Sequence, residues 1–282
     1  MSRFFDRSVR LLIGKPGEVP REFGAVDGDT GAQLRIGFDV NKSKSKTPNK
    51  CKISIYNLTR DSAAYVCKDR NHVLLYAGYG ENLSLLFSGE IRKGTQETGV
   101  EGADRITTFE AAAGGQGYRS ARINKSYASS VKMSQIITEL AKSFGVKADL
   151  TNIDDSTLES GFVATGRSAD IMQQLARALK FDWYFDYDEK LVISPKNGPV
   201  SDQVVLLSPS SGLVGYLKMG KKGSVKGTSL LNTNIRVKYP LRIEGVENGV
   251  GTYMVQSVGH KGDSGYDRTF YTEFEARVVV SG

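Results

Sequence analysis

The sequence predicts an α+β fold dominated by β-structure, in which two β-rich flanks enclose a central α+β module. A strong helical spacing of apolar residues is confined to residues 131–194, and it occurs there twice. On both sides of this stretch, apolar and polar residues alternate with period two between glycine-rich turns, as is typical of antiparallel strands. With 282 residues the chain exceeds one average domain. We therefore predict three domains, at residues 1–125, 126–198 and 199–282.

The central module is predicted to contain two amphipathic helices, each buried against the module's own strands. The first presents six apolar residues at the spacing of one helical face, namely Met133, Ile136, Ile137, Leu140, Ala141 and Phe144. Gly145 follows, and glycine readily adopts the positive φ at which helices end. The second is expected to start near Ser168 as N-cap, with Asp170 in its first turn, where a negative charge suits the helix dipole. Its apolar stripe comprises Ile171, Leu175, Ala176 and Leu179.

The two helical stretches belong to an internal repeat. Residues 135–150 and 170–185 align at a constant offset of 35, with an apolar helix followed by a β-prone run in each copy. Two copies are fewer than the roughly three that a solenoid needs for a continuous core, so a compact, pseudo-symmetric module is expected. Two β-prone runs on either side of Asp188 and Glu189 predict a hairpin at the end of the second copy.

The flanks are predicted to consist almost wholly of strands. In the first flank, Thr59 is expected to cap one short helix, and the strands are predicted at residues 8–13, 34–40, 51–55, 73–77, 83–87 and 105–110. In the second flank, the strands are predicted at residues 204–207, 235–238, 253–258 and 270–280. We expect the flanks to share one topology and to form separate sheets.

The composition limits the classes of protein to which the chain can belong. Its longest apolar runs fall far short of the roughly 20 residues that cross a bilayer, so no contact with a membrane is expected. Two cysteines, Cys51 and Cys67, without a secretory signal at the N-terminus, indicate synthesis in a reducing compartment. The net charge is +7; residues 131–194 hold 7 Lys/Arg and 10 Asp/Glu, so the excess positive charge lies in the flanks.

One stretch matches the pattern of a phosphate-binding loop without its chemistry. Gly215, Gly220 and Lys221 have the spacing G-x-x-x-x-G-K, but Lys222 stands where Ser or Thr would bind magnesium. The following residues, which include two glycines, predict no helix, and the motif requires one. We therefore expect no nucleotide site there.

The remaining polar residues form no recognisable catalytic or metal-binding set. His72 and His260, the two histidines of the chain, have no second ligand at metal-binding spacing, and His260 is expected at a strand end with its ring hydrogen-bonded. Asp154, Asp155 and Glu159 lie in a polar loop and are expected to form a solvated acidic face. We predict no catalytic, cofactor-binding or metal-binding residues, no cofactor, and no enzymatic activity.

Two lysine-rich loops are the candidate partner-contact sites. The first flank contributes Lys42, Lys44, Lys46 and Lys50, and the second contributes Lys221, Lys222 and Lys226. Clustered lysines without acidic neighbours attract phosphates, yet neither loop has the interleaved aromatic residues typical of single-strand binders. A nucleic-acid contact, a subunit contact and a solvated loop therefore stay open at this point.

Segments of all three domains resemble the baseplate hub proteins of contractile phage tails, the group related to late-control protein D. In the first flank, the strings similar to the hub's first tube-like barrel are CKISIYNLT, VLLYAGYG and LLFSGEI. In the centre, the strings similar to the family's inserted module are VKMSQIITELAKSFGV and SADIMQQLARALKFDWYFD. In the second flank, YMVQSVGHKGD and FYTEFEARV resemble the end of the second barrel.

The resemblance implies a structural virion protein of the tail baseplate, assembled in the host cytoplasm. It implies two tail-tube-like antiparallel β-barrel domains around the inserted module, and a homotrimeric, pseudo-sixfold ring. That ring would join the tail tube to the trimeric central spike and line the channel for the tape measure protein and for DNA in transit. The alternatives are a nucleic-acid-binding β-protein and a tail-tube or distal-tail component. We expect both lysine loops to lie at rims of the ring, against acidic surfaces of neighbouring subunits.

Overall fold

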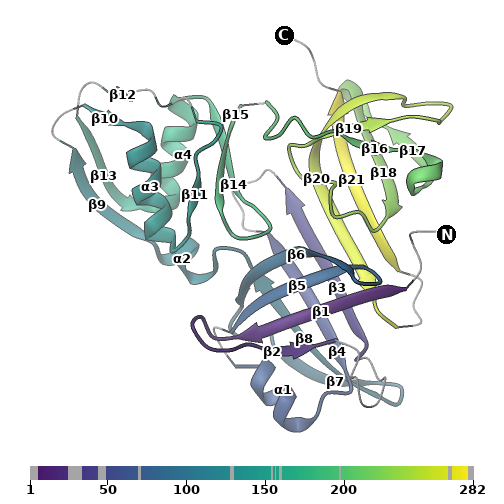
Figure 1. The fold of residues 1–282 in the computed structure, drawn as a ribbon. Helices are drawn as coiled ribbons and strands as arrows, with labels where there is room; N and C mark the ends of the chain where they lie inside the picture. Colours follow the sequence, from purple (N-terminus) through teal and green to yellow (C-terminus); the bar gives the residue numbers. More distant parts are fainter. Residues whose placement is uncertain are drawn as a thin grey trace.

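The fold has three parts, which Figure 1 shows as a lower β-rich part, a helix-containing part at upper left and a second β-rich part at upper right. This computed structural model describes residues 6–24, 34–43, 49–68, 71–127, 130–153, 155, 157–158, 161–196, 198–265 and 269–278. The three parts follow one another along the chain. No helix in these ranges is long and apolar enough to cross a membrane.

The first flank is an antiparallel sheet folded over on itself. Its elements are β1 (Arg7–Gly14), β2 (Arg21–Phe23), β3 (Ile36–Ser43), β4 (Lys50–Tyr56), α1 (Arg60–Val66), β5 (His72–Tyr79), β6 (Asn82–Ile91), β7 (Glu97–Glu101) and β8 (Asp104–Ala112). The strand order is β2-β1-β5-β6-β8-β4-β3, with β7 on β8. The register of β6 and β8 holds only two residue pairs, and β1, β5 and β6 cross over β3, β4 and β8 (Figure 1). The predicted cap of α1 is confirmed, because Thr59 Oγ1 accepts from the Ser62 N–H at 3.2 Å.

The module contains both predicted helices. Its elements are α2 (Gly115–Ser120), β9 (Arg122–Tyr127), β10 (Val131–Lys132), α3 (Met133–Phe144), β11 (Ala148–Asp149), β12 (Thr157–Leu158), β13 (Phe162–Arg167), α4 (Ser168–Ala178), β14 (Phe181–Phe185) and β15 (Leu191–Pro195). All six apolar residues of the α3 stripe are buried, and Gly145 ends the helix at φ 78°. The helices contact the module's own strands, α3 on β9 and β11 and α4 on β13 and β14, as predicted.

The start of α4 differs from the prediction by one residue. Arg167 occupies the N-cap position, and no side chain caps the helix there. Ser168 instead lies within the first turn, fully buried, and accepts a hydrogen bond from the Ser143 hydroxyl at 2.8 Å. A serine in this position can cap its own helix, but the Ser168 hydroxyl instead links α4 to α3. The local sequence does not encode this contact between helices.

The repeat is confirmed for the helices and only partly for the strands. β11 and β14 both pair with β15, but β11 is parallel to it and β14 is antiparallel to it. The two copies therefore share a helix-strand order without sharing a strand direction. The predicted hairpin is formed by β14 and β15, and Glu189 lies in its turn at φ 61°.

The second flank has its own sheet order and its own apolar core. Its elements are β16 (Val205–Leu207), η1 (Pro209–Ser211), β17 (Leu213–Met219), η2 (Lys221–Gly223), β18 (Ser224–Leu230), β19 (Pro240–Ile243), β20 (Gly251–Asp263) and β21 (Phe270–Val278). The prediction of a strand at residues 235–238 is wrong. Ile235 and Val237 are buried and alternate with polar residues, but this segment forms turns closed by the hydrogen bonds Ile235 N to Asn232 O and Tyr239 N to Arg236 O.

The two flanks form one 14-stranded sheet, contrary to the expectation of separate sheets. The cause is β20, a strand of 13 residues. Its first part pairs with β19, and residues 257–263 pair with residues 37–43 of β3. The flanks also differ in pairing, because β16 and β19 are parallel, so the predicted shared topology is wrong for these strands. The described strands do not close into a barrel.

Candidate assembly surfaces

The structure places two of the four predicted lysines of the first flank, Lys42 and Lys50, on strands rather than on an exposed loop. Lys42 is the seventh residue of β3, and Lys50 is the first of β4; Lys44 and Lys46 lie outside the described residues. Lys50 is exposed, whereas Lys42 is only 4% exposed. The prediction of an exposed Lys42 is therefore wrong. The alternation of β3 contained the signal, because Lys42 follows Ile36, Phe38 and Val40 on the core-facing side.

The predicted lysines of the second flank lie on the β17–β18 hairpin. Lys221 and Lys222 are exposed in η2, the connection between the two strands, and Lys222 has φ 56°. Lys226 lies on β18, and its Nζ is 3.1 Å from Glu275 Oε2 on β21. A strand follows the glycine-lysine motif where a phosphate loop would need a helix. This is the local structure that the prediction of no nucleotide site requires.

Lysines from both predicted sets meet at one groove. This groove, of about 630 Å³, lies over the strands that join the flanks and is lined by residues of β3, β4, β17, β18, β20 and β21. Lys42, Lys50 and Lys226 line it, together with Lys218 and two glutamates, Glu273 and Glu275. The sequence did not indicate that these lysines converge, because the pairing of β3 with β20 brings them together.

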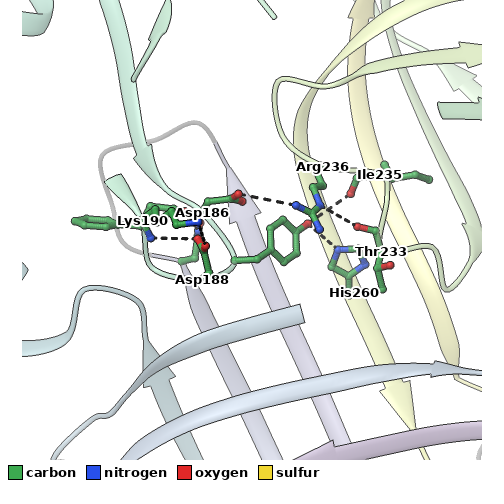
Figure 2. Close-up of polar contacts among 10 residues, drawn as sticks. Asp186, Asp188, Lys190, Thr233, Ile235, Arg236 and His260 are labelled. Carbon is green, nitrogen blue, oxygen red and sulfur yellow. Dashed lines mark hydrogen bonds and ion pairs between the residues drawn. The ribbon is translucent and has the colours of Figure 1, made fainter. Parts of the chain in front are cut away.

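A second site is buried where the turn of the β14–β15 hairpin meets the two flanks. Figure 2 shows Asp186 of this turn joined to Arg236 of the second flank, whereas Asp188 is paired with Lys190 of the hairpin itself. Tyr187, between the two aspartates, is 4% exposed, and its hydroxyl is 3.1 Å from His260 Nε2. The Lys42 Nζ lies 3.1 Å from the centroid of the Tyr187 ring. Residues of β3, the hairpin and β20 therefore meet around one aromatic ring.

The ring of His260 is hydrogen-bonded on both sides, although its position differs from the prediction. His260 lies within β20 rather than at a strand end and is fully buried. Its Nδ1 is 2.9 Å from Thr272 Oγ1, and its Nε2 faces the Tyr187 hydroxyl. A neutral imidazole satisfies both contacts when Nδ1–H donates to Thr272 and Nε2 accepts from Tyr187. Burial, with the charges of Lys42 and Arg236, lowers the pKa of His260 to about 3.

The cations of this junction are partly balanced by the hairpin turn. Burial lowers the pKa of Lys42 to about 7, while the carboxylate of Asp186 opposes that shift. Arg236 Nη1 is 4.0 Å from Asp186 Oδ2, and Arg236 Nε donates to the Thr233 carbonyl at 3.3 Å. The basic side chains of Lys42 and Arg236 therefore both lie near the carboxylate of Asp186 in the hairpin turn.

Glu189, which follows Asp188 in the turn of the β14–β15 hairpin, contacts the first flank. Its carboxylate is hydrogen-bonded to His72 of β5, accepts from the Ser88 hydroxyl of β6 at 2.9 Å, and accepts from the Gly114 N–H at 3.0 Å. Burial raises the pKa of Glu189, but the hydrogen bonds and the charge of His72 outweigh it, so the net shift is downward. One turn therefore contacts both flanks, through Tyr187 and Glu189.

A third contact secures the module to the second flank. Lys238, at φ 65° and 1% exposed, places its Nζ 2.7 Å from Asp182 Oδ2 and 2.9 Å from the Pro195 carbonyl. The base of the hairpin is thereby attached to the segment that was predicted as a strand at residues 235–238. A positive φ at a non-glycine residue costs free energy, and here it accompanies a buried charge pair.

The other predicted polar groups have ordinary surroundings. Asp155 is exposed, lies 3.7 Å from the Lys132 Nζ and accepts from the Ser134 N–H; Asp154 and Glu159 lie outside the described residues. Cys51 and Cys67 are free thiols, and burial raises the pKa of both. Among the residues that the structure describes, no group of three or more His, Cys, Asp or Glu could hold a metal ion.

Comparison with known proteins identifies the fold and the family. The baseplate hub gp41 family matches residues 19–276, and no curated protein matches the sequence. The fold is similar to the 43 kDa tail protein of prophage MuSo2 from Shewanella oneidensis, with a TM-score of 0.68, 9% identity, and 96% and 97% of the two chains covered. It is also similar to the tail protein from Neisseria meningitidis, with a TM-score of 0.61, 9% identity and 97% of each chain covered.

A third similar structure comes from a secretion system. The E. coli c3393 protein, a component of the type VI secretion system, has a TM-score of 0.60 at 12% identity, with 89% of this chain and 76% of that chain covered. It is described as similar to the T4 bacteriophage tail proteins gp27 and gp5. At these identities the structural likeness establishes the fold alone. The match to the baseplate hub gp41 family confirms the resemblance that was stated from the sequence.

Proposed function

Because this chain belongs to the baseplate hub gp41 family and is therefore a structural component of a phage tail, we propose that three copies form a ring between tail tube and spike. In this proposal the ring is pseudo-sixfold, lines the channel for the tape measure protein and DNA, and has no enzymatic role. The observation that carries it is the joined sheet, which places two β-rich flanks side by side in one chain. A threefold ring matches a sixfold tube when each chain presents two β-rich units.

One face of the joined sheet is suited to line a channel. The pairing registers place Tyr271, Lys261, Asp39, Lys52 and Glu110 in one row across β21, β20, β3, β4 and β8. Directly opposite residues in antiparallel strands point to the same face. This face therefore carries a row of charges, and the charged residues of that row alternate in sign. Large exposed apolar patches mark interaction sites. This row of polar and charged residues offers no apolar patch to which a passing polymer could bind.

The opposite face of the same strands is occupied by core. The adjacent row consists of Thr272, His260, Val40, Cys51 and Ala111, all of them buried. We therefore assign the polar face to the channel side of the ring. The α+β module, which contacts the flanks through the β14–β15 hairpin, is placed on the outside of the ring. The units that assemble in this proposal are residues 1–125, 126–198 and 199–282.

The exposed lysines of η2 are proposed as a rim contact with acidic surfaces of neighbouring tube, spike or hub subunits. Each exposed ion pair contributes only about 0 to 1 kcal/mol, so a single lysine change should not affect assembly. The double variant Lys221→Glu, Lys222→Glu should block incorporation into tails while the purified chain keeps its melting temperature. Normal incorporation of this variant into tails would show that Lys221 and Lys222 are exposed to solvent and contact no neighbouring subunit.

The mass of the purified protein in solution separates this function from its alternatives. A trimer supports the hub ring, whereas a stable hexamer would favour a tail-tube or distal-tail component. Salt-dependent retention on DNA would favour a nucleic-acid-binding protein, because neutralising phosphates releases counterions.

A further inference from the structure

The groove between the flanks has a defined order of side chains along its length. One register row contains Lys218, Lys226, Glu275, Ser257 and Ser43, which belong to β17, β18, β21, β20 and β3 in that order. All five residues line the groove. The groove therefore runs across the strands, from the free edge of the second flank toward the first flank.

The neighbouring row extends the groove by one strand. It contains Thr228, Glu273, Gly259, Asn41 and Lys50, and the last of these belongs to β4. These residues also line the groove. Near the middle of the floor, the short side chains of β20 and β3 lie beside Glu273 and Glu275 of β21. An exposed lysine stands toward each end, Lys218 on β17 and Lys50 on β4.

The acidic groups of the groove already have partners within the chain. Glu275 is paired with the Lys226 Nζ at 3.1 Å, and Glu273 with the Lys261 Nζ at 3.1 Å. Lys50 and Lys218 have no hydrogen-bond or ion-pair partner for their side chains among the described residues. The unbalanced positive charge is thus concentrated at the two ends of the groove.

Tyr216 adds an aromatic group to the rim at the Lys218 end. Its side chain is 95% exposed, and it lies where the register of β17 and β18 shifts between Val214 and Lys218. Exposed tyrosines of this kind are enriched in the energetically important positions of protein interfaces.

We propose that this groove binds an extended, acidic segment of another protein, with carboxylates that pair with Lys218 at one end and Lys50 at the other. Five strand spacings separate β17 from β4, which is about 24 Å at about 4.8 Å each. An extended chain covers that length with about seven residues at about 3.3 Å per residue. The acidic residues of the segment therefore lie about seven positions apart, with small residues between them over Glu273 and Glu275.

A nucleic acid fits the same groove less well. A strand that crossed it would place phosphates above Glu273 and Glu275 in the middle of the floor. Binding of single strands uses several aromatic platforms for stacking. Among the residues that the structure describes, only Tyr216 and the buried Phe274 are aromatic residues that line the groove. The groove lies on the polar face that the proposed ring turns toward the channel, because residues 39, 41 and 43 share one side of β3. The binding itself is tested on the purified chain, so its outcome is independent of the ring.

The test measures peptide binding to the purified full-length chain by fluorescence anisotropy. The probe is a labelled peptide with two glutamates at each end of a serine-glycine centre. Its control has the same composition with all glutamates in the centre, and a labelled oligothymidine is measured in parallel. The groove variants are the double variant Lys50→Glu, Lys218→Glu and the uncharged change Tyr216→Ala. The matched control variant is Lys147→Glu, Lys196→Glu, which reverses two exposed lysines of the module.

The proposal predicts that the end-charged peptide binds more tightly than the centre-charged peptide. Affinity should fall about tenfold in Lys50→Glu, Lys218→Glu, because two attractive charge pairs become repulsive, and severalfold in Tyr216→Ala. The module variant should bind like the wild type. Equal losses in both charge-reversed variants, equal binding of both peptides, or no peptide binding would overturn the proposal. Tighter binding of the oligothymidine, lost in the groove variant, would overturn it in favour of a nucleic-acid site.

Discussion

Tyr187 is the residue at which the module, β3 and β20 meet, and its hydroxyl gives the first prediction. The change Tyr187→Phe keeps the ring beneath Lys42 but removes the partner of His260 Nε2, which is fully buried. Leaving a buried polar atom unpaired costs about 1 to 3 kcal/mol. We expect urea unfolding to show a loss of stability in this range. Tyr216→Phe, at a side chain that is 95% exposed, is the control and should unfold like the wild type.

Lys42 gives a prediction about pH. Its pKa is lowered from 10.5 to about 7 in the folded chain because burial disfavours the charge. Between these two values the unfolded chain binds more protons, so Lys42 makes stability rise with pH across this window. Lys42→Met should remove that rise and should stabilise the chain most at and below about pH 7. Melting curves at several pH values test this, and equal slopes for both proteins between pH 7 and pH 10 would contradict it.

The sequence predicts these residues only in part, for a physical reason. The period-two alternation of β3 already placed Lys42 on the core-facing side, but lysine composition suggested a solvated loop. The partners Tyr187 and His260 are 73 positions apart, and local patterns carry no information about which distant side chains meet. Buried polar contacts between domains therefore had to come from the structure.

At the scale of elements, the helical stripes give the next prediction. Leu140 of α3 is fully buried and Leu175 of α4 is 4% exposed. Deleting a buried leucine side chain beyond Cβ costs about 2 to 5 kcal/mol. Leu140→Ala and Leu175→Ala should each lower the melting temperature clearly. Val163→Ala on β13 changes a side chain that is 66% exposed and should leave melting unchanged; unchanged melting in all three would show that the stripes are not core.

The turn of the β14–β15 hairpin gives a prediction about attachment. Glu189→Gln removes the charge that accepts hydrogen bonds from His72, Ser88 and the Gly114 N–H. We expect faster hydrogen exchange at Gly114 and in the hairpin, with α3 unchanged. Because the pKa of Glu189 is lowered on folding, its contribution is present above the unfolded pKa and is lost as pH falls. The difference between the two proteins should therefore shrink in acid, and the exposed change Asp188→Asn is the control.

Helices were predicted better than strands, because a helix is stabilised by residues close in sequence. The α3 stripe, its end at Gly145 and the order of the repeat were all contained in the local spacing. Residues 235–238 show the opposite case. Buried apolar residues alternate with others there as they would in a strand, but the segment forms turns. The β17–β18 hairpin was missed because its glycines and lysines have low strand propensity, although pairing with β21 holds it in place.

At the scale of the whole molecule, the pairing of β3 with β20 is the feature that the sequence did not predict. Alternation identifies a strand and its buried face, but it does not identify the neighbouring strand. That one pairing makes the two flanks a single sheet, aligns the alternating charges of its polar face and brings both lysine sets to one groove. The assembly proposed above depends on this arrangement.

The most direct test of the hub ring is an electron cryomicroscopy reconstruction of intact tails that contain this chain. We expect three copies in one ring at the end of the tube, with the row Lys261, Asp39 and Lys52 facing the channel and the module outside. Six copies in the ring, or a ring in which the buried row of His260 and Val40 opens to the channel, would contradict it.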